Sequence, residues 1–153
     1  MCFVFGRKEK AASMQNPQPQ TTVVKIRRSK GEVVQGCDVY VGRRQHQGGW
    51  NLEDSIYHNP YAVKKYGLEE SLRLYTLHLN TLIRKDPNVW IQNLLNLHGK
   101  VLGCWCKPSK CHGDILKQYA DNLKTLYDQD LQEPVRPHTF PRVNAFVNSL
   151  VIK

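Results

Sequence analysis

The sequence predicts an α/β fold in which a small sheet of about three or more strands packs against helices. Short β-branched or alternating segments occur at residues 22–27, 38–42 and 100–106, as is typical of strands. Longer segments at 68–85 and 114–126 carry apolar residues every three or four positions, as amphipathic helices do. The length of 153 residues suits one domain with its own hydrophobic core, an N-terminal basic arm and a C-terminal tail.

Composition divides the chain into three parts. Residues 1–21 are expected to form a flexible arm, because they are basic and then rich in Gln and Pro. Residues 22–126 hold the predicted strands and helices, and residues 127–153 form an extension. Residues 1–30 carry a balance of +6 out of a net charge of +9. Such an arm attracts polyanions, so we expect either contact with nucleic acid or a nucleotide, or a solvated terminus.

The first two strands and the loop after them follow from residue type. Residues 22–27 are β-branched, and Val39 and Val41 alternate with Tyr40, so these two segments are expected to pair as antiparallel strands. Residues 42–60 then form a long loop. Its aromatic residues, which include Trp50, are costly to leave in water, so we expect the loop to be ordered and to lie over the functional site.

Two helices and a third strand come next. The helix at 68–85 is followed by one at 89–97, for which Pro87 suits the first turn and Gly99 suits the end. Residues 100–106 are expected to form a strand that leads into a helix starting at Gly113 or Asp114.

A short C-terminal helix is predicted because four apolar residues share one helical face: Val143, Phe146, Val147 and Leu150. This segment either packs back on the domain or, through residues 141–153, docks a protein partner. No apolar run approaches the ~20 residues that span a bilayer, so we expect no membrane insertion. The start of the chain lacks the pattern of a signal peptide, so the expected location is intracellular.

Residues 104–114 form the segment richest in chemistry, with three of the five cysteines and one of the six histidines. Cys104 and Cys106 stand two positions apart in a predicted strand and are expected to project together, with Trp105 on the opposite face, in the core. Cys111 and His112 stand at the start of a helix. The unpaired N–H groups there favour a thiolate or a bound phosphate.

Four interpretations of this cluster stay open. Zinc is bound by Cys104, Cys106, Cys111 and His112, although ligands so close together in one turn are unusual. Alternatively, Cys111 or His112 is a catalytic nucleophile or base oriented by Asp114. A third possibility is a redox pair, such as Cys106 with Cys111. The fourth is structural, with buried cysteines acting as apolar residues and Asp114 as a helix cap.

A second set of residues is expected to bind an anion. Arg43 directly follows the strand end at Gly42 and can clamp a phosphate, unless it is a solvated loop residue. Lys107 and Lys110 bring positive charge to the helix start, where Gly113 lies.

These residues resemble the DUF4326 family, a domain of unknown function found in phages, bacteria and large DNA viruses. The resemblance is carried by residues 38–43, by Trp50 and Asn59-Pro60-Tyr61, and by the signature from Cys104-Trp105-Cys106 to Cys111-His112-Gly113-Asp114. It covers roughly residues 22–126, with extra residues inserted between Trp50 and Asn59. It implies a small intracellular α/β domain, in the host cytoplasm or the virion if the source is viral, and adds Trp50 and Asn59 to the ligand-binding set.

Two functional hypotheses result. The first is a domain that binds a nucleotide-like, phosphate-bearing ligand and acts as an enzyme of nucleotide or nucleic-acid metabolism, with Cys111, His112 and Asp114 at the catalytic end. The second is a non-catalytic nucleic-acid-binding or virion-associated structural protein with a structural or zinc-binding cluster.

Overall fold

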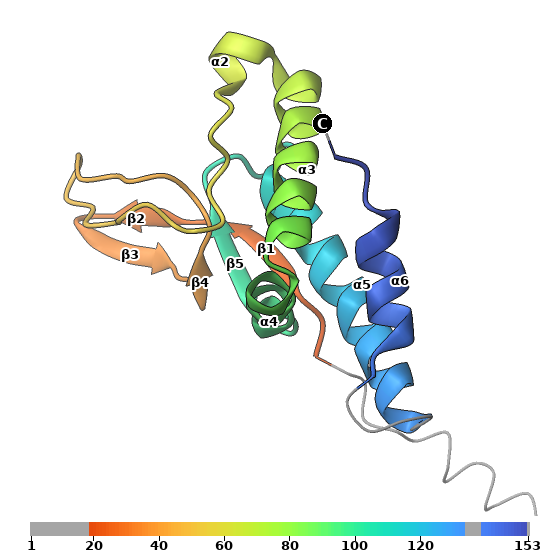
Figure 1. Ribbon diagram of the computed structural model, residues 1–153. Helices are drawn as coiled ribbons and strands as arrows, with labels where there is room; N and C mark the ends of the chain where they lie inside the picture. The colour runs from red at the N-terminus through yellow and green to blue at the C-terminus, as the bar shows by residue number, and fades with distance from the viewer. Residues whose placement is uncertain (1–18, 134–138, 153) are drawn as a thin grey trace, which may run out of the picture.

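The main sheet is built from three short strands that are far apart in the sequence (Figure 1). The computed structural model describes residues 19–133 and 139–152. β1 (Thr22–Lys25) and β4 (Val39–Tyr40) lie on either side of β5 (Val101–Cys104), and both run parallel to it. The predicted fold class is confirmed.

The predicted antiparallel pairing of residues 22–27 with residues 38–42 is wrong. Because three of the four residues of β5 are buried, that strand takes the central position between β1 and β4. The antiparallel pair is instead the hairpin of β2 (Arg27–Ser29) and β3 (Glu32–Gln35). At its tip Lys30 and Gly31 have φ angles of 52° and 84°, the positive values that a two-residue type I′ turn requires.

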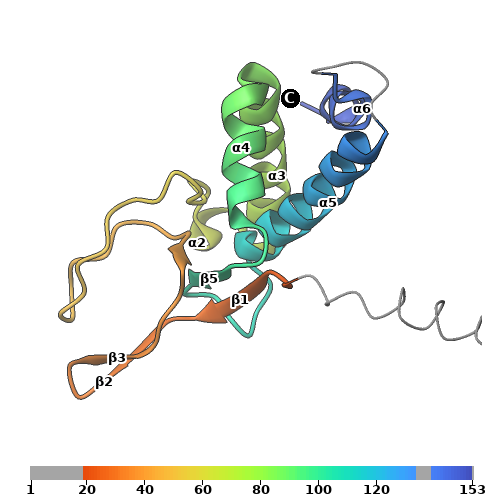
Figure 2. The same cartoon turned by 90° about the horizontal axis from the view of Figure 1, so that it is seen from below.

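The described residues form five helices: α2 (Val63–Tyr66), α3 (Leu68–Lys85), α4 (Pro87–Leu97), α5 (His112–Gln132) and α6 (Pro141–Ser149). Figure 2 shows α3, α4 and α5 on one side of β1 and β5. The bounds of α3 are those that the sequence predicts. At the start of α4 the Asp86 carboxylate accepts a hydrogen bond from the Val89 N–H, and Pro87 occupies the first turn.

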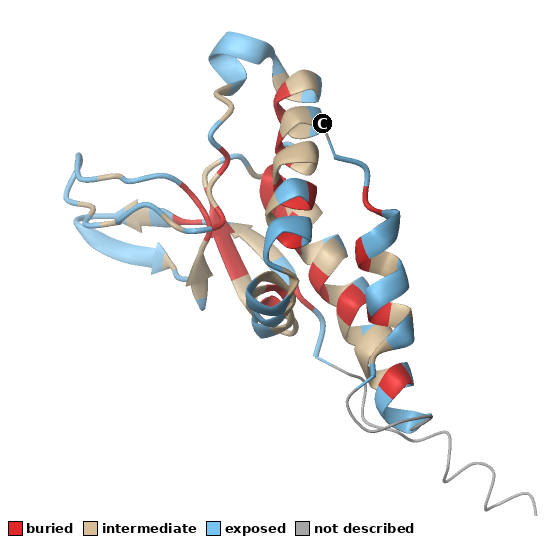
Figure 3. Cartoon of the chain, viewed as in Figure 1, coloured by how far each residue is buried: buried red, intermediate tan, exposed pale blue. Residues whose placement is uncertain are grey.

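The hydrophobic core lies between the sheet and these helices. Buried positions cover β5 and the facing sides of α3 and α5 (Figure 3). Its largest fully buried side chains include Tyr75, Leu79, Ile83, Leu94, Leu97, Leu102, Leu116 and Leu123. Burying a side chain of this size stabilises the fold by about 1.5–3 kcal/mol. Since Leu116 and Leu123 belong to α5, their burial holds this helix against the sheet.

The segment before β1 is attached to the domain at Thr21. The Thr21 hydroxyl is buried, donates to the Asp121 carboxylate at 2.5 Å and accepts the Gly99 N–H at 2.9 Å. The predicted arm otherwise lies outside the described residues, since these begin at residue 19.

The C-terminal segment packs against the rest of the chain. Val143 and Val147 of α6 are buried, and the Asp130 carboxylate of α5 accepts the N–H groups of Arg142 and Val143 at 3.0 and 3.1 Å. The apolar face predicted for this helix is therefore used within the chain. No helix among the described residues is long and apolar enough to cross a membrane.

Candidate ligand-binding site

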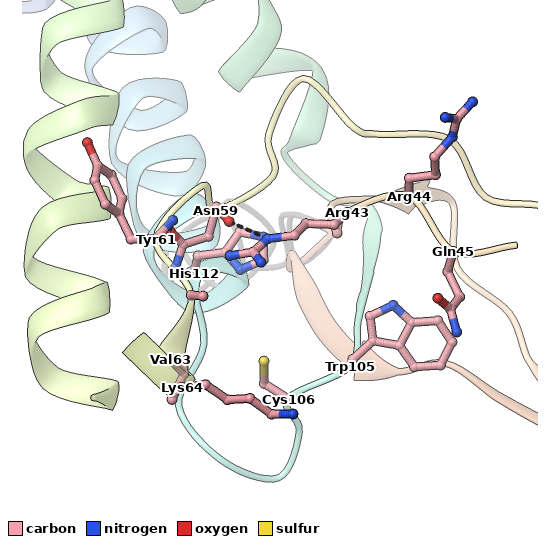
Figure 4. Close-up of a pocket in the computed structure, with 12 residues that line it drawn as sticks. Arg43, Arg44, Gln45, Asn59, Tyr61, Val63, Lys64, Trp105, Cys106 and His112 are labelled. Carbon is pink, nitrogen blue, oxygen red and sulfur yellow. Dashed lines mark hydrogen bonds between the residues drawn. The ribbon is translucent and has the colours of Figure 1, made fainter. Parts of the chain in front are cut away.

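A cavity of about 450 Å³ opens at the carboxyl ends of β4 and β5. Its lining comes from the chain just after β4, from the end of the long loop with α2, from the residues after β5 and from the first residue of α5. Figure 4 shows the side chains that these separate segments contribute to the lining, among them Arg43 and His112. Ligands in parallel α/β sheets bind at this edge, because the loops and helix N-termini converge there.

Arg43 is held in place by the long loop. Its Nε–H donates to the Asn59 carbonyl oxygen at 2.8 Å (Figure 4). The Asn59 side chain is itself fully engaged, since its amide donates to the Ser71 hydroxyl and its oxygen accepts the Tyr61 N–H, both at 2.9 Å. Asn59 therefore fixes the loop on α3, and its backbone orients the guanidinium of Arg43.

The long loop contacts the rest of the domain through its aromatic side chains. The Tyr57 ring is buried and its hydroxyl donates to the Asn93 carbonyl of α4 at 2.9 Å. Gln45 and Leu52 form an antiparallel bridge across the loop. Trp50 packs edge-on against Trp105, with ring centroids 5.0 Å apart, while the Arg28 guanidinium lies over its ring. Trp50 thus joins the loop to the hairpin and is not among the residues that line the cavity.

His112 is the first residue of α5 and lines the cavity while being only 7% exposed. Its Nε2–H donates to the Val41 carbonyl oxygen at 2.6 Å. Burial lowers the pKa of this imidazole, although the hydrogen bond to Val41 opposes the shift, so the ring is neutral near pH 7. A neutral ring that donates through Nε2 carries a free lone pair on Nδ1, which makes Nδ1 a proton acceptor.

The three cysteines of the signature lie together around Cys104. The Sγ atoms of Cys104 and Cys111 are 3.0 Å apart, and both residues are buried. Hydrogen bonds from the Cys106 and Cys111 thiols lower the pKa of Cys104, and the same bonds raise the pKa of its two neighbours. Cys106 is exposed and lines the cavity. β5 spans Val101–Cys104, so it begins one residue later and ends two residues earlier than the strand predicted at 100–106.

The start of α5 is capped by the protein itself. Cys111 and Asp114 form a reciprocal capping box, in which the Cys111 sulfur accepts the Asp114 N–H and the Asp114 carboxylate accepts the Cys111 N–H at 3.1 Å. The same carboxylate pairs with Lys107 at 2.5 Å. Two of the backbone N–H groups expected to hold a phosphate, those of Cys111 and Asp114, therefore already have protein partners.

Only part of the predicted site meets at the cavity. Gly42, Arg43, Asn59, Cys106 and His112 line it. The remaining predicted residues are not among its lining: Trp50, Cys104, Lys107, Lys110, Cys111, Gly113 and Asp114. Gly113 has a packing role, because a Cβ there would lie 2.9 Å from the Val23 side chain of β1.

The zinc hypothesis gains no support from this arrangement. Across residues 19–133 and 139–152, no group of three or more His, Cys, Asp or Glu side chains lies where it could hold a metal ion. The Nε2 atom of His112 is committed to the Val41 carbonyl, and the Cys111 sulfur serves the helix cap.

Several lining residues were not predicted from the sequence. Tyr61, Lys64, Arg44 and Gln45 line the cavity without having been singled out as ligand-binding. Trp105, expected in the core, is half-buried and also lines the cavity, while its indole N–H donates to the Tyr40 hydroxyl at 2.6 Å. Tyr61 belongs to the Asn59-Pro60-Tyr61 motif that carries the family resemblance, which could have pointed to it, whereas no sequence signal pointed to Lys64.

The family can now be stated from comparison with known proteins. The family model for a domain of unknown function, DUF4326, matches residues 24–122, which is more than half of the chain. The chain belongs to the DUF4326 family. This DUF4326 protein is also 36% identical over 116 residues to an uncharacterized protein of Acanthamoeba polyphaga mimivirus, covering 71% of the chain and 85% of the viral protein. The predicted resemblance and its link to a large DNA virus are confirmed. No solved structure matches the chain.

Proposed function

We propose that this DUF4326 domain binds a small phosphate-bearing ligand of the nucleotide type in the cavity at the carboxyl ends of β4 and β5. The observation that carries the proposal is the charge of the lining. Arg43 and Lys64 are cationic, and none of the lining residues is Asp or Glu. Arg44 also lines the cavity, but its guanidinium pairs with Glu53 at 3.2 Å and points away from Arg43 (Figure 4), so the positive charge comes from Arg43 and Lys64. A cleft lined by one sign of charge concentrates ligands of the opposite sign.

The position of Arg43 supports an anion clamp. Its Nε–H is bound to the Asn59 carbonyl, and among the described residues no acidic side chain pairs with it or with Lys64. A guanidinium that is fixed on one side offers its remaining N–H donors as a fork, which matches the oxygens of a phosphate.

Aromatic side chains and volume support a ligand larger than phosphate alone. Tyr61 and Trp105 line the cavity and offer apolar surface for a flat ring. The volume of about 450 Å³ falls within the range of about 300–1,000 Å³ that is typical of small-molecule sites. We therefore place the phosphate near Arg43 and the rest of the ligand toward Tyr61 and Trp105.

For an enzymatic role, we propose His112 as the proton acceptor, since its Nδ1 is unprotonated in the neutral ring and the residue lines the cavity. Cys111 and Asp114 become positioning residues in this proposal, because their capping box fixes the first turn of α5 and with it His112.

The test is isothermal titration calorimetry of the full chain with adenosine monophosphate, adenosine and inorganic phosphate. We expect the monophosphate to bind more tightly than the other two. Arg43→Ala should weaken its binding by about 10- to 150-fold, since a hydrogen bond to a charged group is worth about 1.5–3 kcal/mol. Arg73→Ala is the matched control, because Arg73 is exposed on α3 and pairs with Glu70. Equal binding by the wild type and Arg43→Ala would contradict the proposal.

Two partner predictions from the sequence remain. Nucleic acid would bind through the basic arm, residues 1–21, and the salt dependence of oligonucleotide binding with and without that arm would measure its contribution. A protein partner for residues 141–153 would have to use the outer side of α6 or the exposed Val151 and Ile152 that follow it.

A further inference from the structure

The cysteines around Cys104 differ in accessibility in a way that the ligand site does not explain. Cys104 and Cys111 are only 1% and 2% exposed, whereas Cys106, two residues from Cys104, is exposed at the cavity. The buried pair comes from two different elements, the end of β5 and the residue before α5. Their Sγ atoms lie 3.0 Å apart, about 1 Å more than the ~2.05 Å of a disulfide bond.

Cys104 is close to both other cysteines of the segment. Its Sγ shares a hydrogen bond with that of Cys111 at 3.0 Å, and Cys106 stands two residues further along the chain, just past the end of β5. A cysteine in this position can exchange a disulfide with one neighbouring cysteine for a disulfide with the other while β5 and α5 stay in place. In a reducing compartment, such a pair is typical of transient redox chemistry rather than of a permanent cross-link.

We propose that Cys104 and Cys111 form a reversible disulfide, and that Cys106 is the thiol through which a low-molecular-weight disulfide oxidises them. This inference is independent of the ligand proposed for the cavity. It assigns a thiol–disulfide exchange site to the cysteines of the segment from Cys104 to Asp114.

The exchange proceeds in three balanced steps. First, the Cys106 thiolate attacks oxidised glutathione, so that a mixed disulfide forms and one glutathione thiolate leaves. Next, the Cys104 thiolate attacks the Cys106 sulfur, which releases the second glutathione thiolate. Finally, the Cys111 thiolate attacks the Cys104 sulfur and frees Cys106. Overall, two protein thiols are oxidised to one disulfide, one glutathione disulfide is reduced to two glutathione molecules, and the thiol protons are conserved.

Structure and access assign the roles. Only Cys106 of the three is exposed, so it is the first to meet an oxidant. Cys111 ends up in the disulfide because it faces Cys104 inside the core and is sheltered from solvent. A small disulfide reductant would reverse the sequence through the same exposed thiol.

The full, reduced chain is incubated with oxidised glutathione, alkylated, digested with trypsin and mapped by mass spectrometry. Trypsin does not cleave before Pro108, so it releases residues 101–110, with Cys104 and Cys106, and residues 111–117, with Cys111. We expect the loss of two of the five free thiols and a cross-link between these two peptides, with two hydrogens lost and full reversal by dithiothreitol.

Variants separate the roles. Cys111→Ser should abolish the cross-link, and Cys106→Ser should retain it but form it more slowly. Cys37→Ser is the matched control, since Cys37 is a half-buried thiol that packs against Gly103 and takes no part in the proposed exchange, and it should leave the yield unchanged. The proposal is overturned if the wild type keeps all five thiols, if the lost thiols map to Cys2 and Cys37, or if Cys106→Ser oxidises as fast as the wild type.

Discussion

Replacing Cys111 by alanine is expected to lower the free energy of unfolding by about 2 kcal/mol. Two contributions add up to this value. Loss of the sulfur from the capping box costs up to about 1 kcal/mol, since the Asp114 N–H keeps only the Cys111 carbonyl oxygen, at 3.0 Å, as its acceptor. Deleting a sulfur atom from a site that is 2% exposed costs about 1 kcal/mol more in lost burial and packing. For a chain of this size the sum corresponds to a fall in Tm of about 4–8 °C.

The assay is urea unfolding followed by circular dichroism, with all samples kept reduced. Cys111→Ser is the matched control, because its hydroxyl restores an acceptor at the start of α5 and should recover about half of the loss. If the alanine variant lies within about 0.5 kcal/mol of the wild type, the sulfur does not cap the helix and the reasoning fails. A full loss of structure would instead show that the whole cluster holds the fold together.

Two further outcomes concern the neighbours of the cavity. Tyr75→Phe should cost about 1–3 kcal/mol by urea unfolding, because the buried Tyr57 carbonyl loses the hydroxyl that donates to it at 2.8 Å; Tyr61→Phe serves as the control and should be nearly neutral. Burial lowers the pKa of His112 in the folded chain, so acidification below about pH 6.5 favours the unfolded state and reduces stability. His112→Asn should flatten that dependence between pH 7.5 and 5, and an unchanged slope would contradict a neutral, buried imidazole.

Local patterns were enough to predict four of the five helices among the described residues. They missed α2, which has only four residues, and they ended α5 at Leu126, whereas it continues to Gln132. The bounds of α3 follow from its apolar period, and α4 begins at the proline that marks its first turn. Strand pairing was not predictable in the same way, because β4 has only two residues and its pairing depends on backbone contacts with a distant segment. The residues between the two predicted strands form a separate hairpin, β2 and β3, which turns at Lys30 and Gly31.

The residues of the candidate site were also predicted only in part. Arg43 and His112 stood out because they flank a strand end and a helix start, and both line the cavity. Lys64 did not stand out, since an exposed lysine in a short helix resembles any surface lysine. Conversely, the sequence suggested Asp114 as a catalytic residue because its side chain is a carboxylate. In the structure this carboxylate accepts the Cys111 N–H and pairs with Lys107, so it caps the helix.

The central position of β5 has a consequence for the order in which the domain assembles. Residue 22 pairs with residue 101, and residue 39 pairs with residue 102, so both outer strands are synthesised long before the strand that joins them. During synthesis on the ribosome β1 and β4 have no partner in this sheet until β5 emerges, and closing such long loops slows folding. A fragment that stops at residue 100 would expose both strands and lack the cavity. Co-translational folding of this chain therefore waits for the segment that carries Cys104, Cys106 and Cys111.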